Sequence, residues 1–234
     1  MKETKQTHLS SRVTLIIAVI LIIASSLFYI LGKADTISSE TKPVKTTSKL
    51  DNVLPVSATD HVRGDPYAPI IIVEYSDTEC PFCNKLQATM KEVISKYESG
   101  EVAWVYRHFP IDELHPKARK EAVALECAGE LGGNDIFWSY TDRLYETTPA
   151  NNNLDPEELP KIAEYVGLNR EKFNECLAST RYDALIESHV QNAQATGAQG
   201  TPWSIVIGKN GKKYSFSGAQ PASAIQQIIT IASK

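Results

Sequence analysis

The hydrophobic pattern of the chain combines short apolar runs with longer segments in which apolar residues recur at helical spacing. The run Ile70–Tyr75 is β-branched and too apolar for a half-exposed strand, so it predicts a buried strand of a sheet covered on both faces. A second strand is predicted over 101–109, and a hairpin over 203–217 around Asn210-Gly211. We also expect a short edge strand at Val53–Val56, because Pro55 argues against a central position.

Between about 116 and 196, the apolar residues recur at helical spacing. This spacing predicts one helix over 117–128 that ends at Gly129 and another over 135–145, then a loop at 151–153 and helices that begin at Asp155 and Asn169. Further helices are expected after the first predicted strand, as far as Gly100, and near the end of the chain from Pro221. With 234 residues and 42% hydrophobic content, the chain can bury one good core but hardly two large ones, so we expect one α/β domain.

The first 59 residues differ from the rest. Residues 13–31 are apolar and uncharged and, at about 1.5 Å per residue, just long enough to cross a bilayer core. This segment exceeds the roughly 7–15 apolar residues of a signal peptide, so we favour a retained transmembrane anchor over a cleaved signal, although 32–34 offers a cleavage site. We expect 1–12 to be cytoplasmic and 32–59, much of it rich in Ser, Thr and Lys, to be a flexible tether.

Two cysteines follow the first predicted strand. Cys80 and Cys83 are three residues apart at the start of a predicted helix, and Pro81 suits the first helical position. Residues three apart share a helix face, so the spacing permits a reversible disulfide. Unpaired amides and the positive end of the helix dipole stabilise a thiolate, so we expect a lowered pKa for Cys80 as the exposed nucleophile. Cys83 would then be its resolving partner.

The alternatives for this pair are half of a zinc site or a purely structural bridge. A structural zinc site needs four ligands in paired clusters. The other cysteines, Cys127 and Cys176, are isolated, and the histidines show no metal-binding spacing. We therefore interpret the pair as a redox centre, and expect neither a metal nor a cofactor.

Several stretches carry a family resemblance. They are Arg63–Pro69, Ile72–Asp77, the motif Cys80–Cys83, Tyr106–Pro110 and Gly200–Pro202. On these motifs the chain resembles the DsbA-like thiol-disulfide oxidoreductases of the thioredoxin superfamily, from about residue 60 to residue 234. The resemblance implies an α/β thioredoxin-like fold with an inserted helical subdomain at about 116–196, here preceded by the predicted transmembrane helix.

The resemblance also implies roles for three further residues. In the family, an acidic residue six positions before the first cysteine is buried beneath the active site and helps to move protons, and Glu74 occupies this position. The alternative is a strand-edge glutamate that reaches solvent. The resemblance further implies a cis bond before Pro202, which packs against the cysteine pair. The backbone of Thr201 would then align a substrate segment by strand-like pairing.

Cys127 and Cys176 lie on two different predicted helices of the insertion. In an exported protein with one other cysteine pair, a structural disulfide is the better interpretation. It would enclose about fifty residues and contribute roughly 4 kcal/mol by the chain-entropy model. Two buried free thiols remain the alternative.

These observations predict an extracytoplasmic oxidase that forms disulfides in exported proteins with free thiols. A disulfide-forming domain belongs in an oxidising compartment, so we expect a single-pass cell-membrane protein with its catalytic domain outside. The resemblance implies a membrane redox partner that reoxidises the enzyme. The net charge of −4 gives no support for nucleic acid as a partner.

The direction of electron flow stays open in the sequence. Phe82 supplies no polar help to a thiolate, and its bulk could desolvate the sulfur. Glu79, next to Cys80, would oppose the thiolate unless solvent screens it. The alternatives are therefore a disulfide reductase or isomerase, a membrane-anchored copper metallochaperone, or a scaffold with inert cysteines.

Overall fold

A computed structural model describes residues 48–98 and 100–234. Within them, a five-stranded sheet has the order β1-β3-β2-β4-β5. The strands are β1 (His61–Arg63), β2 (Ile70–Ser76), β3 (Val102–His108), β4 (Trp203–Ile207) and β5 (Lys213–Ser217). β2 and β3 are parallel, and the other neighbouring pairs are antiparallel. The predicted central strands and the hairpin of β4 and β5 are confirmed.

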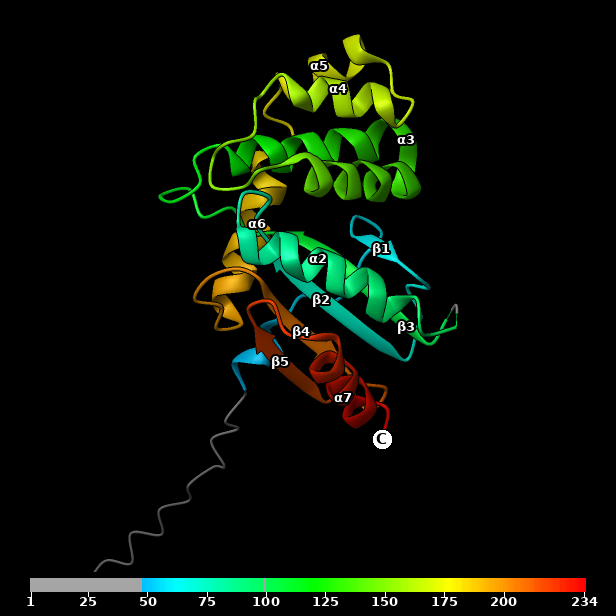
Figure 1. Ribbon diagram of the computed structural model, residues 1–234. Helices are drawn as coiled ribbons and strands as arrows, with labels where there is room; N and C mark the ends of the chain where they lie inside the picture. Colours follow the sequence, from blue (N-terminus) through cyan, green and yellow to red (C-terminus); the bar gives the residue numbers. More distant parts are fainter. Residues whose placement is uncertain (1–47, 99) are drawn as a thin grey trace, which may run out of the picture. The chain divides into compact units, whose positions relative to one another are not determined.

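Helices cover both faces of this sheet (Figure 1). α2 (Pro81–Ile94) and α7 (Ala222–Ala232) pack together on one face, and α6 (Asp183–Ala195) covers β2 and β3 on the other. The alternation of side chains along β2 divides its apolar residues between two cores, because Ile70 and Ile72 join the first, whereas Val73 and Tyr75 join the second. Because both faces of β2 are buried, its sequence is a continuous apolar run.

The helical insertion consists of α3 (Ala118–Thr147), α4 (Glu158–Tyr165) and α5 (Arg170–Leu177), and the chain returns to the sheet through α6 (Figure 1). α3 is kinked at Gly133, which has a positive φ of 78°. The prediction that Gly129 ends the first helix is wrong, because the helix continues past it. A Cβ at Gly129 would lie 2.6 Å from the ring of His61, so this glycine permits close packing of α3 against β1.

The start of the domain also differs from the prediction. No strand forms at Val53–Val56; the described edge strand next to β3 is β1 instead. The buried guanidinium of Arg107 explains the difference, because it binds both carboxylate oxygens of Asp60 at 2.8 and 3.1 Å and the carbonyl oxygens of Leu54 and Pro55 at 3.1 Å. Residues 54–60 therefore accept hydrogen bonds from the Arg107 side chain and do not pair with a neighbouring strand.

The tether prediction for 32–59 is accordingly wrong for its described part. Lys49–Asn52 forms the short 3-10 helix η1, Asn52 donates to the carbonyl of Ala195 at 2.9 Å, and Val53 is buried. The rest of that segment, like the predicted anchor 13–31 and the predicted cytoplasmic residues 1–12, lies outside the described residues. In the described part of the chain, every helix is too short or too polar to cross a bilayer.

Candidate active site

The cysteine pair lies where β2 passes into α2. Cys80 is the N-cap of α2, Pro81 is its first residue, and Cys83 lies one turn into the helix. This is the placement that the sequence predicts. Cys83 is fully buried and its sulfur accepts a hydrogen bond from the backbone N–H of Asp77 at 3.4 Å. Both cysteines are free thiols in this structure.

The two sulfurs differ in their electrostatic surroundings. A hydrogen bond from the Cys83 thiol lowers the pKa of Cys80 to about 6, against the opposing effect of burial, and the backbone N–H groups of Cys83 and Phe82 contribute further. Burial raises the pKa of Cys83 well above its usual value, and the neighbouring Cys80 adds to the rise. Cys80 is thus the group that ionises near neutral pH, as expected, although its partner thiol contributes more than the helix start.

The accessibility of Cys80 departs from the prediction of an exposed nucleophile. Only 5% of the residue is exposed. The loop before β4 covers it, because the Cys80 thiol lies 3.5 Å from the carbonyl oxygen of Thr201, to which it donates. Phe82, by contrast, is 61% exposed, so most of its surface faces solvent.

The loop opposite the cysteines contains a cis peptide bond between Thr201 and Pro202. Next to this loop is a hollow of about 310 Å³. Its lining residues are Gly197, Gln199, Gly200, Thr201, Pro202, Trp203, Ser217 and Gly218. Thr201 thus contacts Cys80 through its carbonyl oxygen, and both Thr201 and Pro202 line the hollow.

Glu74 is buried below the cysteines, and the alternative of a solvent-reaching glutamate is wrong. Its carboxylate accepts hydrogen bonds from Ser76 Oγ at 2.8 Å and from Trp104 Nε1 at 3.0 Å. Burial raises the pKa of Glu74 to about 7, even though both hydrogen bonds oppose the rise. A carboxyl group with this pKa can both give and take a proton at neutral pH.

Glu79 does not reach solvent either, so solvent does not screen it from Cys80. It is fully buried, and its carboxylate accepts a hydrogen bond of 2.6 Å from the backbone N–H of Asn152. The backbone N–H of Asn151 also binds the Glu79 carbonyl at 2.8 Å. Glu79 therefore connects the turn before Cys80 to the loop after α3 by hydrogen bonds.

Behind Glu79 lies Glu121 of α3, which is 1% exposed. Neither of its carboxyl oxygens has a hydrogen-bond partner among the described residues. Burial raises the pKa of Glu121 to about 9, and the nearby carboxyl groups of Glu79 and Asp77 reinforce the rise. Glu121 is therefore protonated at neutral pH in the folded chain.

We expect Glu121→Gln to raise the free energy of unfolding at pH 8 by up to about 5 kcal/mol, because glutamine has no proton to lose on unfolding and each pH unit above about 4.5 costs the wild type about 1.4 kcal/mol. The folded chain keeps a proton that the unfolded chain loses above about pH 4.5, so wild-type stability falls as the pH rises from there toward 9. Glutamine removes this decline. Urea unfolding at pH 5 to 9 measures it.

Glu126→Gln is the matched control on the same helix. Glu126 is 4% exposed and bonds His108 at 2.7 Å and His61 at 3.1 Å. Although burial opposes them, these contacts lower the pKa of Glu126 to about 2, so its replacement should lower stability. Parallel pH curves for Glu121→Gln and wild type would contradict the prediction.

Cys127 of α3 and Cys176 of α5 form a disulfide, with 5.8 Å between their Cα atoms. It lies in the helical insertion, and both residues are buried. No group of three or more potential metal ligands occurs in the part of the chain that the structure describes.

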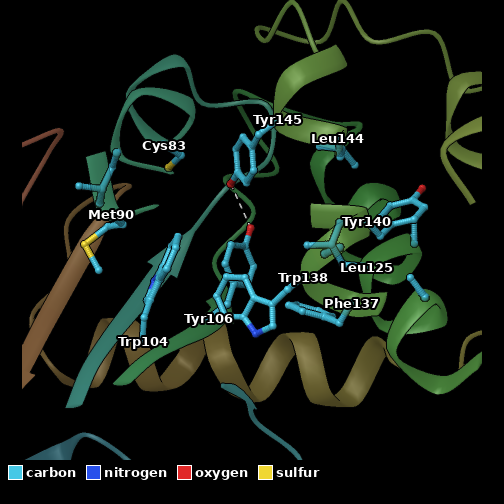
Figure 2. Close-up of a cluster of buried hydrophobic side chains, with 14 of the residues drawn as sticks. Cys83, Met90, Trp104, Tyr106, Leu125, Phe137, Trp138, Tyr140, Leu144 and Tyr145 are labelled. Atoms are coloured by element: carbon cyan, nitrogen blue, oxygen red, sulfur yellow. Dashed lines mark hydrogen bonds between the residues drawn. The ribbon is translucent and has the colours of Figure 1, made fainter. Parts of the chain in front are cut away.

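Sequence reasoning missed three partners of the site: Ser76, Trp104 and Tyr145. Ser76 Oγ lies 3.1 Å from the hydroxyl of Tyr145, which lies 3.0 Å from the hydroxyl of Tyr106. Figure 2 shows the last two hydroxyls pointing at each other, one from β3 and one from α3. The polar Ser76 at the end of an apolar strand was the available signal for this network.

The sequence matches known proteins over most of its length. A family model described as thioredoxin matches residues 56–230. The chain is 36% identical over 161 residues to the Na(+)/H(+) antiporter NhaA 3 of Salinispora tropica, covering 68% of this chain and 24% of that protein. It is 33% identical over 184 residues to NhaA 1 of Salinispora arenicola, covering 78% and 26%. The chain thus spans about a quarter of the length of these curated relatives.

Solved structures share the fold. DsbA2 of Pseudomonas aeruginosa is 26% identical with a TM-score of 0.63, over 76% of this chain and 95% of that one. Oxidised BdbD of Bacillus subtilis is 23% identical with a TM-score of 0.65, over 76% and 95%. The α-DsbA1 protein of Wolbachia pipientis is 22% identical with a TM-score of 0.66, over 80% and 96%.

The last two likenesses concern the fold alone, whereas the family match extends from the chain before β1 into α7 and includes the cysteine pair. The architecture, the two cysteines at the start of α2 and the cis-proline loop beside them agree with it. The chain belongs to the thioredoxin family, as a DsbA-like thiol-disulfide oxidoreductase.

Proposed function

We propose that this oxidoreductase acts as an oxidase that introduces disulfides into exported proteins. The observation that carries the proposal is the lowered pKa of Cys80 beside a Cys83 whose pKa is raised. A stabilised thiolate favours the dithiol form of the enzyme, which makes its disulfide a better oxidant. The DsbA-like fold implies thiol-bearing proteins as substrates.

The reaction follows from this asymmetry. A substrate thiolate attacks Cys80 of the oxidised enzyme, the bond between Cys80 and Cys83 breaks, and Cys83 leaves with the electron pair. A second substrate thiolate then attacks the substrate sulfur of the mixed disulfide and releases Cys80 as its stabilised thiolate. The substrate has lost two electrons and two protons, and the enzyme is left as the dithiol. A membrane redox partner would accept these electrons and restore the disulfide.

Other residues would serve this exchange. Glu74 would give a proton to the departing Cys83 and take it back on reoxidation, since its pKa is raised to about 7. Thr201, whose carbonyl contacts Cys80, and Pro202 both line the adjoining hollow and would align an extended substrate segment. Neither role requires a particular substrate sequence, so broad specificity follows.

We further propose that the chain is anchored in the cell membrane through 13–31, with residues 60–234 on the extracytoplasmic side. The apolar, uncharged character of that segment supports the anchor. The buried disulfide between Cys127 and Cys176 supports an oxidising compartment. Trapping of exported proteins on Cys80 in intact cells tests this placement, because adducts form only if both partners occupy the same side.

The reduction potential of the Cys80 and Cys83 pair tests the direction of electron flow. We expect a value between the about −270 mV of a reductase and the about −120 mV of a strong oxidase, because the pKa of Cys80 lies between those of their nucleophilic cysteines. The full chain is equilibrated with glutathione buffers and its free thiols are counted. A variant with Cys80→Ser and Cys83→Ser provides the baseline. A value near −270 mV, typical of a reductase, would reverse the proposed direction.

A further inference from the structure

A cluster of buried hydroxyl groups lies beneath Cys83, where β2, β3 and α3 meet. Its members are Ser76, Tyr106 and Tyr145, which are 2%, 1% and 4% exposed. Ser76 donates to Glu74 at 2.8 Å and lies 3.1 Å from the Tyr145 hydroxyl. Figure 2 shows Tyr145 and Tyr106 joined by their hydroxyls, with Cys83 on the neighbouring helix. The cluster is therefore closed to bulk solvent and in contact with one carboxyl group.

The same serine also reaches the resolving cysteine. A hydrogen bond with Ser76 lowers the pKa of Cys83, although burial, the largest influence, raises it more. Ser76 thus forms hydrogen bonds with both buried groups that must exchange a proton, Glu74 and Cys83. A hydroxyl is suited to this place because it donates one hydrogen bond while it accepts another.

We propose that the Ser76 hydroxyl relays the proton between Glu74 and Cys83, and that the Tyr145 hydroxyl positions Ser76 for this transfer. The inference rests on the proposed role of Glu74, but it holds for either direction of electron flow. It also gives the helical insertion a part in the chemistry of the thioredoxin core, because Tyr145 belongs to α3.

The relay balances as follows. When the disulfide is attacked at Cys80, Cys83 leaves as a thiolate and takes the Ser76 hydroxyl proton, while Ser76 takes the proton of the Glu74 carboxyl group. In the reverse step, the Cys83 thiol gives its proton to Ser76 and Ser76 gives its own to the Glu74 carboxylate. No other donor or acceptor is needed, because one proton moves from the carboxyl group to the sulfur or back.

The charged and titratable neighbours are compatible with this role. Cys83 of α2, Tyr106 of β3 and Tyr145 of α3 face Glu74. Burial raises the pKa of both tyrosines well above 10, so they stay protonated and supply hydroxyl groups only. Ser204, the partner of Glu74 in β4, cannot titrate in this range. Glu74 is therefore the proton acceptor of this cluster near neutral pH.

The relay can be tested with the aromatic disulfide DTNB, because only the second step of that reaction removes the proton of Cys83. Cys80 attacks first and releases one thionitrobenzoate; Cys83 then attacks the mixed disulfide, releases the second and gives up its proton. In stopped-flow traces from pH 5 to 9, we expect the wild-type second phase to level off above about pH 7, where Glu74 is ionised. Ser76→Ala should slow this phase about 10²-fold at pH 7 and shift its rise to higher pH.

Three comparisons make the result specific. Ser204→Ala is the matched control, since Ser204 is equally buried beside Glu74 but its hydroxyl has no hydrogen-bond partner in the described chain; its rate should stay within twofold of wild type. Glu74→Gln should slow the same phase, and adding Ser76→Ala should slow it no further. The first phase should not change in Ser76→Ala.

Two outcomes would overturn the relay. If Glu74→Gln slows the second phase while Ser76→Ala does not, the relay is wrong but the role of Glu74 stands. If neither variant slows the second phase, both the relay and the proton-transfer role of Glu74 are wrong. Should Ser76→Ala fail to fold, the wild-type second phase in mixtures of H₂O and D₂O decides instead: a curved dependence on deuterium content supports two protons in motion, and a linear one contradicts the relay.

Discussion

Cys83→Ser should accumulate mixed disulfides, because the Cys80 thiolate attacks a disulfide of an exported protein, expels one of its sulfurs as a thiolate, and no Cys83 remains to resolve the adduct. Cys80→Ser should instead lose thiol-disulfide exchange by more than about 10³-fold. The asymmetry comes from burial and charge. Cys80 lies at the start of α2, and its pKa is lowered to about 6. Cys83 is fully buried, and this burial raises its pKa well above 9. Cys83 therefore cannot replace Cys80 as the nucleophile.

The trapped adducts also report where the enzyme works. With the full chain expressed in bacterial cells, we expect adducts between the Cys83→Ser variant and exported proteins on non-reducing gels. A membrane-impermeant thiol added to intact cells should release them. The variant with both Cys80→Ser and Cys83→Ser is the control and should carry no adduct through this site.

Different outcomes separate the parts of the proposal. Adducts that persist in the double variant would show that another thiol reacts. Adducts with cytoplasmic proteins, or adducts that the impermeant thiol reaches only after lysis, would contradict the extracytoplasmic placement but leave the roles of Cys80 and Cys83 intact. No adduct from Cys83→Ser under any condition would contradict Cys80 as the cysteine that exchanges with substrates.

The cysteine site was predictable from sequence because all of its signals are local. An apolar strand, a short polar turn and a helix start lie within fifteen residues, from Ile70 to Cys83. Their order places Cys80 at the helix start without any knowledge of distant contacts. Glu74 and Pro202 needed the family resemblance, since neither the burial of the first nor the cis bond of the second can be read from local pattern.

The rest of the site depends on contacts between distant segments. Tyr145 lies 69 residues from Ser76 and reads in the sequence only as a residue of a helix. Glu79 looks like a surface residue next to Cys80 until α3 and the loop at 151–152 cover it. Composition and periodicity describe how one element is buried, but not which polar groups from other elements share its surroundings.

The errors in the predicted fold also come from contacts between distant segments. Gly129 resembles a helix end, yet it is a point of close approach between α3 and His61 of β1. Arg107 occupies one position in an alternating strand, yet its guanidinium is buried and determines the path of residues 54–60. In both cases a tertiary contact overrides a local preference that was read correctly.

The disulfide of the helical insertion gives the largest expected effect on stability. Replacement of Cys127 and Cys176 by alanine should lower the free energy of unfolding by about 4 kcal/mol, because the bridge closes a loop of 49 residues in the unfolded chain. It joins α3 to α5, and α5 is only eight residues long. An isolated helix of that length is unstable in water, so the bridge and the surrounding core must hold it.

Urea unfolding of the double alanine variant and the wild type measures the difference. Wild type in a mild reductant that opens only the active-site pair is the control, since the second disulfide is buried and should survive. The rate of exchange at Cys80 should stay within about twofold of wild type at temperatures where the variant is folded. A loss below about 1 kcal/mol would mean that packing, such as Tyr140 stacked on Phe173 at 5.5 Å, holds α5 without the bridge.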